Sequence, residues 1–301
     1  MTLVVARRSS FGVHVLSDLR ISHPEERRDG LPHGALKAVL LNEDVCACFA
    51  GSLALGGDAI AELARQGDGL DADGATSALY EVHKAHSDRT EFLVVCRSPV
   101  RFLKVAERAI EESETSAWIG DHAAFSAFQA LCLGPPLSPR FELPPEVAAR
   151  VDPQGDRDDF VQQMDALREV IADPSIETVG DARVVVRGNE AEGFGYRPYM
   201  EMDNGLDPPA IHAVGGEEVN ILRAGTAAIG AYAYSVLVPK SPGVGVLGVH
   251  VLQANLGFLY HPAVSETAAV YSSVTPQEFI AAVVHEHGVE LTGIVFTSRA
   301  P

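Results

Sequence analysis

The residues nearest the start of the chain have the types and spacing that could carry out a chemical reaction. An apolar run of β-forming residues begins at the second position, in Met1-Thr2-Leu3-Val4-Val5. Removal of Met1 would leave Thr2 as a free N-terminal threonine at the head of a buried strand. Such a residue can act as a nucleophile, because its hydroxyl attacks while its own α-amino group accepts the proton. The sequence therefore predicts N-terminal threonine chemistry that depends on the loss of Met1.

Strands must position this threonine. Short apolar runs separated by turn residues predict four strands before residue 52, at 2–8, 11–17, 36–41 and 45–49. Ala50-Gly51-Ser52 ends the fourth strand. Helical periodicity then predicts helices at 57–65, 75–86, 123–133 and 159–171. Further strands are predicted at 91–96, 100–105, 117–120, 182–187 and 194–202. This order is typical of helices outside two stacked antiparallel sheets.

The composition changes after residue 202, where Lys and Arg become rare and Val, Ala, Leu and Gly dominate. Strands are predicted there at 219–222, 231–238, 244–252, 258–260 and 291–296. Thr275-Pro276-Gln277-Glu278 predicts a helix start, with Thr275 as N-cap and Glu278 completing a capping box. We therefore expect a domain over 1–202 and a β-rich extension over 203–301. The extension carries no catalytic signature.

Composition excludes several classes of function. A net charge of −18 argues against nucleic-acid partners and anionic membrane surfaces, which favour basic proteins. An apolar content of 47% with 21% charged residues is typical of an ordinary globular protein. We find no signal peptide and no apolar run long enough for a bilayer, which predicts a cytoplasmic protein.

The histidines and cysteines predict neither metal nor cofactor. His285-Glu286-His287 lacks the i, i+4 spacing of a helical zinc protease, and a solvated helix end is the favoured interpretation. His83 and His86 could share a helix face, but no carboxylate or cysteine pattern completes a site. The four cysteines form no C-x-x-C pair, so we expect buried free thiols: Cys46, Cys48, Cys96 and Cys132.

Several of these residues fall into one spacing pattern. After Thr2 comes Asp18-Leu19-Arg20-Ile21-Ser22, Lys37 heads the third strand, and the fourth ends in Phe49-Ala50-Gly51. This pattern resembles the β-type subunits of the proteasome and the related bacterial peptidase HslV. Mature chains of that family begin with Thr, carry Asp-x-Arg-x-Thr/Ser after the second strand, and place a Lys before the strand that ends in glycine. The resemblance covers residues 1–202.

The resemblance implies roles that agree with the chemistry. The positive charge of Lys37 would favour the neutral form of the Thr2 amine, which titrates near pH ~8 in isolation. Asp18 would keep Lys37 charged and oriented. The backbone N–H of Gly51 would lie where an oxyanion develops. The remaining implied roles concern the substrate, which would contact Arg20, Ser22 and Phe49; Ser22 would pair with its backbone and Phe49 would line its first pocket.

The chain departs from the family pattern in two places. A Gly-Ser-Gly-type segment is replaced by Gly120-Asp121-His122, which removes the serine that supports the free amine. Asp121 or His122 could substitute for it, or the site could have lost its function. Where the family has Asp-x-x-Ser-Gly, the chain has Ser175-Ile176-Glu177-Thr178, and Thr178 is the candidate replacement for the second serine.

Together these observations predict an α+β fold: a four-layer αββα sandwich of the N-terminal-nucleophile (Ntn) hydrolase, proteasome-like type, with a C-terminal β-rich extension. The predicted function is hydrolysis of peptide or amide bonds by Thr2. The alternatives are a catalytically inactive structural or assembly subunit, and a small-molecule amidase on the same fold. The resemblance also implies a homo-oligomeric ring with a partner ATPase or activator.

Overall fold

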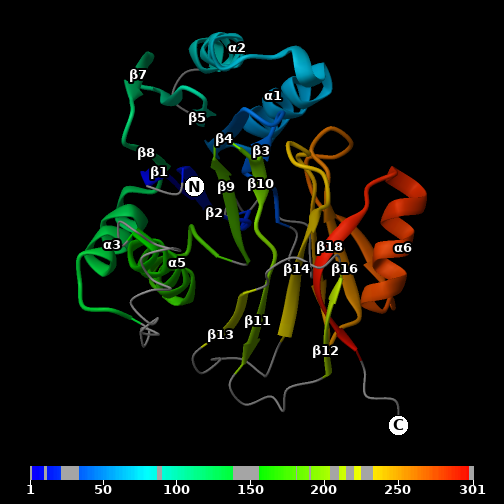
Figure 1. Cartoon of the computed structure of the whole chain (residues 1–301). Helices are drawn as coiled ribbons and strands as arrows, with labels where there is room; N and C mark the ends of the chain where they lie inside the picture. Colours follow the sequence, from blue (N-terminus) through cyan, green and yellow to red (C-terminus); the bar gives the residue numbers. More distant parts are fainter. Residues whose placement is uncertain are drawn as a thin grey trace.

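A computed structural model describes residues 2–9, 12–21, 34–86, 90–137, 156–180, 182–189, 191–203, 210–214, 220–224 and 233–297. These residues form a mixed α and β structure with several antiparallel sheets (Figure 1), which confirms the expected mixture of helices and antiparallel strands. None of the helices among the described residues is long and apolar enough to cross a membrane.

Sheet I carries the start of the chain. Its order is β10-β9-β2-β1-β8, and every neighbouring pair is antiparallel. The strands are β1 (Leu3–Ser9), β2 (Gly12–Asp18), β8 (Ser116–Gly120), β9 (Arg183–Asn189) and β10 (Gly193–Tyr196). Alternation in β1 sends Val4 and Ala6 to one face and Leu3 and Val5 to the other, so both faces of this sheet are buried.

Sheet II packs against the Val4 face of sheet I. Its order is β3-β4-β5-β6-β7. The strands are β3 (Ala38–Leu40), β4 (Val45–Gly51), β5 (Thr90–Arg97), β6 (Val100–Ala106) and β7 (Ala109–Ser113). Residues of β4 such as Ala47 and Cys48 share one core with Val4 and Ala6. This shared core holds the two sheets face to face.

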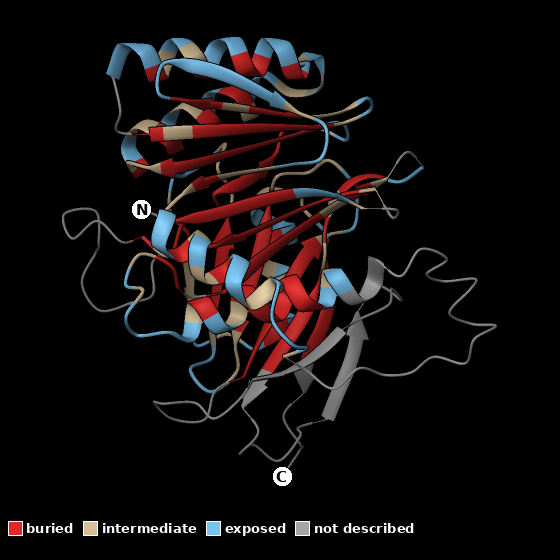
Figure 2. Cartoon of the chain, turned by 90° about the vertical axis from the view of Figure 1, so that its left-hand side faces the viewer, coloured by how far each residue is buried: buried red, intermediate tan, exposed pale blue. Residues whose placement is uncertain are grey.

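Helices cover the outer faces of these two sheets, with their exposed residues turned outward (Figure 2). On sheet II lie α1 (Leu53–Gln66) and α2 (Ala72–His86), which are joined by the short helix η2 (Gly67–Gly69). On sheet I lie α3 (His122–Cys132) and α5 (Asp156–Ala172), where Phe128 and Leu167 pack against Leu3 and Val5.

Sheet III lies beside this body and has α6 (Pro276–His287) on one face (Figure 1). Its order is β12-β18-β14-β15-β16-β17, and β11 pairs with β13 and β14. The strands are β11 (Tyr199–Asp203), β12 (Ala210–Val214), β13 (Asn220–Ala224), β14 (Ala233–Pro239), β15 (Leu247–Val251), β16 (Leu256–Tyr260), β17 (Ala269–Ser272) and β18 (Leu291–Thr297). In β14, Val236 joins the core of sheets I and II, whereas Leu237 packs against α6. Sheet III therefore packs against sheets I and II through apolar side chains.

Most predicted elements are confirmed within a few residues, including the capping box of Thr275 and Glu278. The predicted strand 194–202 is wrong as a single element, because the chain passes from β10 in sheet I to β11 in sheet III around Pro198. Proline lacks the N–H that a continuing ladder would need. The predicted domain boundary after residue 202 stays a prediction, and β11 spans it.

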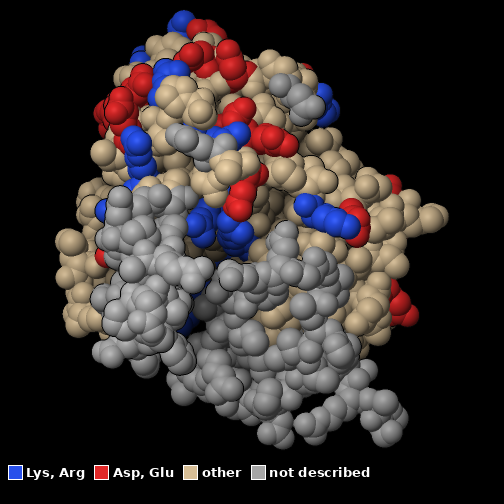
Figure 3. All heavy atoms as spheres, in the orientation of Figure 1, with Lys and Arg blue, Asp and Glu red and all other residues tan. Residues whose placement is uncertain are grey.

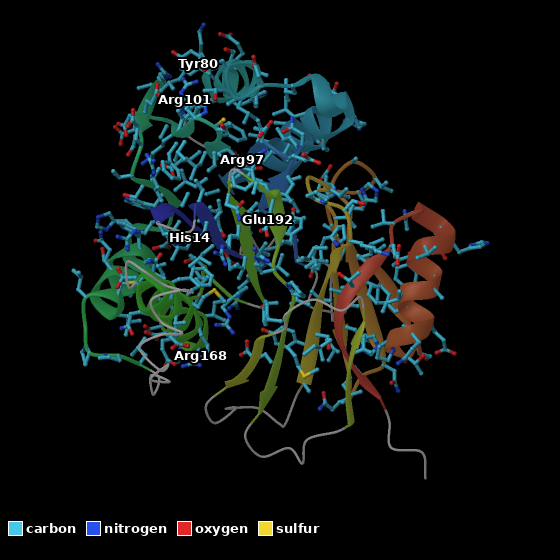
Figure 4. All side chains as sticks on the ribbon, in the orientation of Figure 1. His14, Tyr80, Arg97, Arg101, Arg168 and Glu192 are labelled. Atoms are coloured by element: carbon cyan, nitrogen blue, oxygen red, sulfur yellow. The ribbon has the colours of Figure 1, made fainter. Side chains whose placement is uncertain are left out.

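Ion pairs connect α2, β6 and β7 at the exposed edge of sheet II. Acidic and basic side chains mix on the surface over α2 and β7 (Figure 3). Arg101 of β6 pairs there with Asp73 of α2 and Glu112 of β7, and Tyr80 lies nearby (Figure 4). Exposed ion pairs of this kind contribute little to stability. This end of the molecule is an ordinary charged surface.

Candidate active site

Thr2, Asp18 and Lys37 meet in one buried cluster at the start of β1. Lys37 Nζ donates to Thr2 Oγ1 at 2.6 Å and to Asp18 Oδ2 at 3.0 Å, and the Thr2 hydroxyl donates to Asp18 Oδ1. The third Lys37 donor contacts the carbonyl oxygen of Arg20. The three residues are 1%, 0% and 4% exposed, respectively. The threonine oxygen thus lies between a buried cation and a buried carboxylate.

Backbone donors complete the surroundings of Asp18. Its Oδ1 accepts from Leu3 N at 3.3 Å, and its Oδ2 accepts from Arg20 N at 3.1 Å and Gly180 N at 3.2 Å. A buried carboxylate is tolerated when such donors and a cation satisfy it. The contacts come from the start of β1, the segment after β2, the segment before β3 and the segment before β9, so the Asp18 carboxylate joins four parts of the chain.

The local fold explains how Lys37 reaches Thr2. After β2, Arg20 forms an isolated antiparallel bridge with Gly34, and Ala35 N donates to Leu19 O at 2.8 Å. These bonds bring the chain back alongside Asp18 just before Lys37. A side chain at Gly34 would crowd Leu19 O, at 2.7 Å from its Cβ, so this return requires a glycine.

The end of β8 holds the backbone of Thr2. Asp121 N donates to Thr2 O at 2.7 Å. Gly120, just before it, has φ +109°, and a Cβ there would overlap the Thr2 carbonyl. Both the positive φ and the close approach of two backbones require glycine. The glycine of the Gly120-Asp121-His122 segment therefore has a clear structural reason.

The structure brings together two of the predicted supporting residues. Asp121 is the N-cap of α3, where its Oδ1 accepts from Ala123 N at 2.8 Å and Ala124 N at 3.0 Å. Its Oδ2 accepts from the Thr178 hydroxyl at 2.8 Å. Asp121 and Thr178 thus form one polar unit beside the Thr2 backbone. His122 is exposed and lies against the ring of Trp118, outside this unit.

The charge of Asp121 gives a testable pH dependence. Burial opposes its ionisation, but donors from Ala124 N, the Thr178 hydroxyl and Ala123 N outweigh burial and lower its pKa. A lowered pKa stabilises the fold above the unfolded value of about 4, and this stabilisation disappears as pH falls through the folded value. We expect Asp121→Asn, which keeps a capping oxygen, to lower the free energy of unfolding at pH 7 and to cause a smaller loss at pH 3.

Urea denaturation at the two pH values measures this difference, with the exposed residue Asp58 replaced by Asn as a control. An equal loss of stability at both pH values would show that the Asp121 charge plays no part.

The other predicted site residues lie around the cluster. Gly51 ends β4 with φ +122°, and the preceding Ala50 contacts the end of β8 near Gly120. The Phe49 ring packs against Gly56 of α1 and is 3% exposed. The Arg20 side chain lies over Gly180, and its Nη1 donates to Val179 O at 3.5 Å. Met1 and Ser22 lie outside the described residues.

Two contacts of the site have no signal in the sequence. Glu91 Oε2 accepts from Gly120 N at 2.8 Å, which adds a carboxylate beside the end of β8. Gly180 places its N–H on Asp18 from 162 positions away. Both depend on which strands become neighbours, which local patterns do not reveal.

Two histidines make contacts inside the fold. His83 Nδ1 lies 2.7 Å from Thr90 O, and Arg108 N donates to His83 Nε2 at 3.1 Å. His14 faces α5 (Figure 4), where its Nε2 lies 2.9 Å from Gln163 Oε1. Within the described part of the chain, no group of three or more His, Cys, Asp or Glu side chains could hold a metal ion. The cysteines Cys46, Cys48, Cys96 and Cys132 are free thiols.

No protein-family model matches the chain, and no curated protein matches it in sequence. What the site can do must therefore be argued from its geometry. The Lys37 ammonium lies against Thr2 Oγ1, so it would stabilise negative charge that develops on that oxygen. The Asp18 carboxylate keeps Lys37 in place and accepts from the hydroxyl. This arrangement suits a threonine alkoxide that attacks an electrophilic carbon.

Proposed function

We propose that the chain is an N-terminal threonine hydrolase of the proteasome β-subunit and HslV-like Ntn family, which cleaves peptide or amide bonds. The observation that carries the proposal is the buried contact of Lys37 with both the Thr2 hydroxyl and Asp18. The stacking of α1 and α2 on sheet II, and of α3 and α5 on sheet I, agrees with an αββα sandwich. Sheet III is then the C-terminal extension.

The proposed reaction begins when Met1 is removed and Thr2 gains a free amine. Thr2 Oγ1 attacks the carbonyl carbon, and its proton passes to the amine and then to the leaving nitrogen as the C–N bond breaks. Water hydrolyses the resulting threonine ester, which releases a carboxylic acid and restores Thr2. Lys37 lowers the barrier by stabilising the alkoxide, and the Gly51 N–H would stabilise the oxyanion.

Asp121 and Thr178 are the proposed supports for the free amine in place of the family's serines. The proposal is supported by the Asp121 backbone N–H, which donates to Thr2 O, and by the Thr178 hydroxyl, which donates to the Asp121 carboxylate. A carboxylate next to an amine favours its protonated form, so Asp121 and Lys37 would act on the amine in opposite directions.

The alternative function is that of a catalytically inactive structural subunit. Thr2 is 1% exposed in the chain that still carries Met1, so a protein that keeps Met1 would fit this alternative, since a substrate must reach the Thr2 oxygen. A small-molecule amidase uses the same site and differs only in substrate. A homo-oligomeric ring and an ATPase or activator partner are proposals from the family resemblance alone. A cytoplasmic location is proposed from the free cysteines, which suit a reducing compartment.

The deciding experiment combines intact mass with trapping of an acyl intermediate. We expect purified protein to lack Met1, and a β-lactone or activated amide to add one acyl group to the peptide that begins at Thr2. Release of amine from a panel of peptides and small N-acyl amides then separates peptidase from amidase. Quantitative retention of Met1 would overturn the hydrolase proposal and leave the structural subunit.

A further inference from the structure

A buried ion pair joins sheet III to the strand beside Asp18. Arg183 of β9 is 1% exposed, and its Nη2 lies 2.7 Å from Glu201 Oε2 of β11. Its Nη1 donates to Met164 O of α5 at 2.9 Å, and the guanidinium lies 5.3 Å from the centre of the Tyr199 ring. The arginine therefore has polar and aromatic partners from two elements besides its own strand, β11 and α5.

Sheet III supplies the only carboxylate that the described contacts give this guanidinium. Glu201 is 5% exposed and its Oε2 also accepts from the Tyr234 hydroxyl of β14 at 2.8 Å. The Tyr199 hydroxyl donates to Arg183 O at 2.8 Å. Removing one partner of a buried pair leaves a charge that must find another counterion. Without Glu201, the Arg183 guanidinium would need another carboxylate within reach.

The sheet register places Asp18 within reach of Arg183. Asp18 of β2 is directly opposite Arg183 of β9 in the antiparallel ladder. Residues directly opposite each other project from the same face, with Cβ atoms about 4.5–5.5 Å apart. An arginine side chain can span that gap, yet Arg183 turns to Glu201 while Asp18 binds Lys37 and Thr2. Arg183 thus starts from a position beside Asp18 but pairs with Glu201, whereas Lys37 pairs with Asp18.

We infer that Glu201 is a positioning residue of the Thr2 site: it holds Arg183 away from Asp18, which leaves Asp18 to bind Lys37 and Thr2. The role in catalysis rests on the proposed function. Sheet III is then a required part of the site, because its β11 supplies the carboxylate and its β14 orients it through Tyr234. A free Arg183 would compete with Lys37 for Asp18 and displace the ammonium from Thr2.

The test uses Glu201→Gln in the full chain, with acetylation of Lys37 by acetic anhydride as a readout that needs no activity. Lys37 is 4% exposed, so we expect little acetylation in wild type and several-fold more in Glu201→Gln. The exposed residue Lys84 is the internal reference, and Glu290→Gln, which breaks an exposed pair with Lys240, is the control for lost charge. If Glu201→Gln does not fold, Tyr234→Phe is measured in its place. This variant removes one donor to Glu201, and we expect a smaller increase in Lys37 acetylation.

A double variant separates competition between Arg183 and Lys37 for Asp18 from a general loss of packing around the site. Arg183→Met combined with Glu201→Gln removes the competing cation together with its partner, so Lys37 should be protected again. Turnover, measured on the substrate that wild type cleaves, should fall about 10²-fold in Glu201→Gln and recover in the double variant. A double variant as reactive at Lys37 as the single one would overturn the inference. If wild type has no turnover, the proposed function fails while the acetylation result still decides the role of Glu201.

Discussion

Replacing Thr2 with valine is expected to lower kcat/KM for amide hydrolysis at least about 10³-fold, as loss of a nucleophile does in other covalent hydrolases. Valine has the shape of threonine and lacks only the hydroxyl, so the β1 strand should keep its place. The variant loses the contacts of Thr2 Oγ1 with Lys37 and Asp18. We expect this to lower the free energy of unfolding by about 1–3 kcal/mol, a cost that is small beside the loss of activity.

The matched control is Thr2→Ser, which keeps an oxygen at the same position. Rates are compared only between samples whose intact masses show the same N-terminus, since a retained Met1 would abolish activity in any variant. We expect the serine variant to form the same acyl intermediate at its N-terminal residue. If the valine variant cleaves amides as fast as wild type, another residue is the nucleophile.

The sequence predicts the fold best where burial follows a simple period. The unbroken apolar run Leu3-Val4-Val5-Ala6 indicates a buried strand, and the structure buries this strand on both faces. By contrast, β7 was not predicted, because Ala109–Ser113 is an exposed edge strand with two glutamates and no apolar alternation. Apolar periodicity indicates which residues are buried, so an exposed edge strand without apolar residues at regular spacing is not detected.

For the candidate site, too, some residues could be predicted from the sequence and others could not. The grouping of Thr2, Asp18 and Lys37 was predicted from the resemblance of their spacing to a family pattern, and the structure brings the three side chains together. The contact of Asp121 with Thr178 spans 57 positions, and the opposition of Asp18 to Arg183 depends on sheet order. Such contacts follow from which strands become neighbours. One sequence supplies no such information, so Glu91, Gly180, Arg183 and Glu201 were not predicted as parts of the site.

The second large effect is expected for Lys37→Met, which keeps the length of the side chain and removes its charge. Asp18 then keeps four neutral donors, namely the Thr2 hydroxyl and the amides of Leu3, Arg20 and Gly180, but loses its cation. Breaking a buried pair in this way costs about 3–5 kcal/mol. Because the four donors remain, we expect a value near the lower end. Turnover should fall at least about 10³-fold, since the Thr2 alkoxide loses the charge that stabilises it.

Stability and chemistry can be separated by adding Asp18→Asn to Lys37→Met. The double variant holds no unpaired buried charge, so it should unfold at a higher urea concentration than Lys37→Met alone. It should still be inactive, because no ammonium faces Thr2 Oγ1. If activity instead returned together with stability, Lys37 would serve only to neutralise Asp18. The same outcome would leave the close contact of Lys37 Nζ with Thr2 Oγ1 without a catalytic role, and Thr2 would then hydrolyse the amide without a neighbouring ammonium.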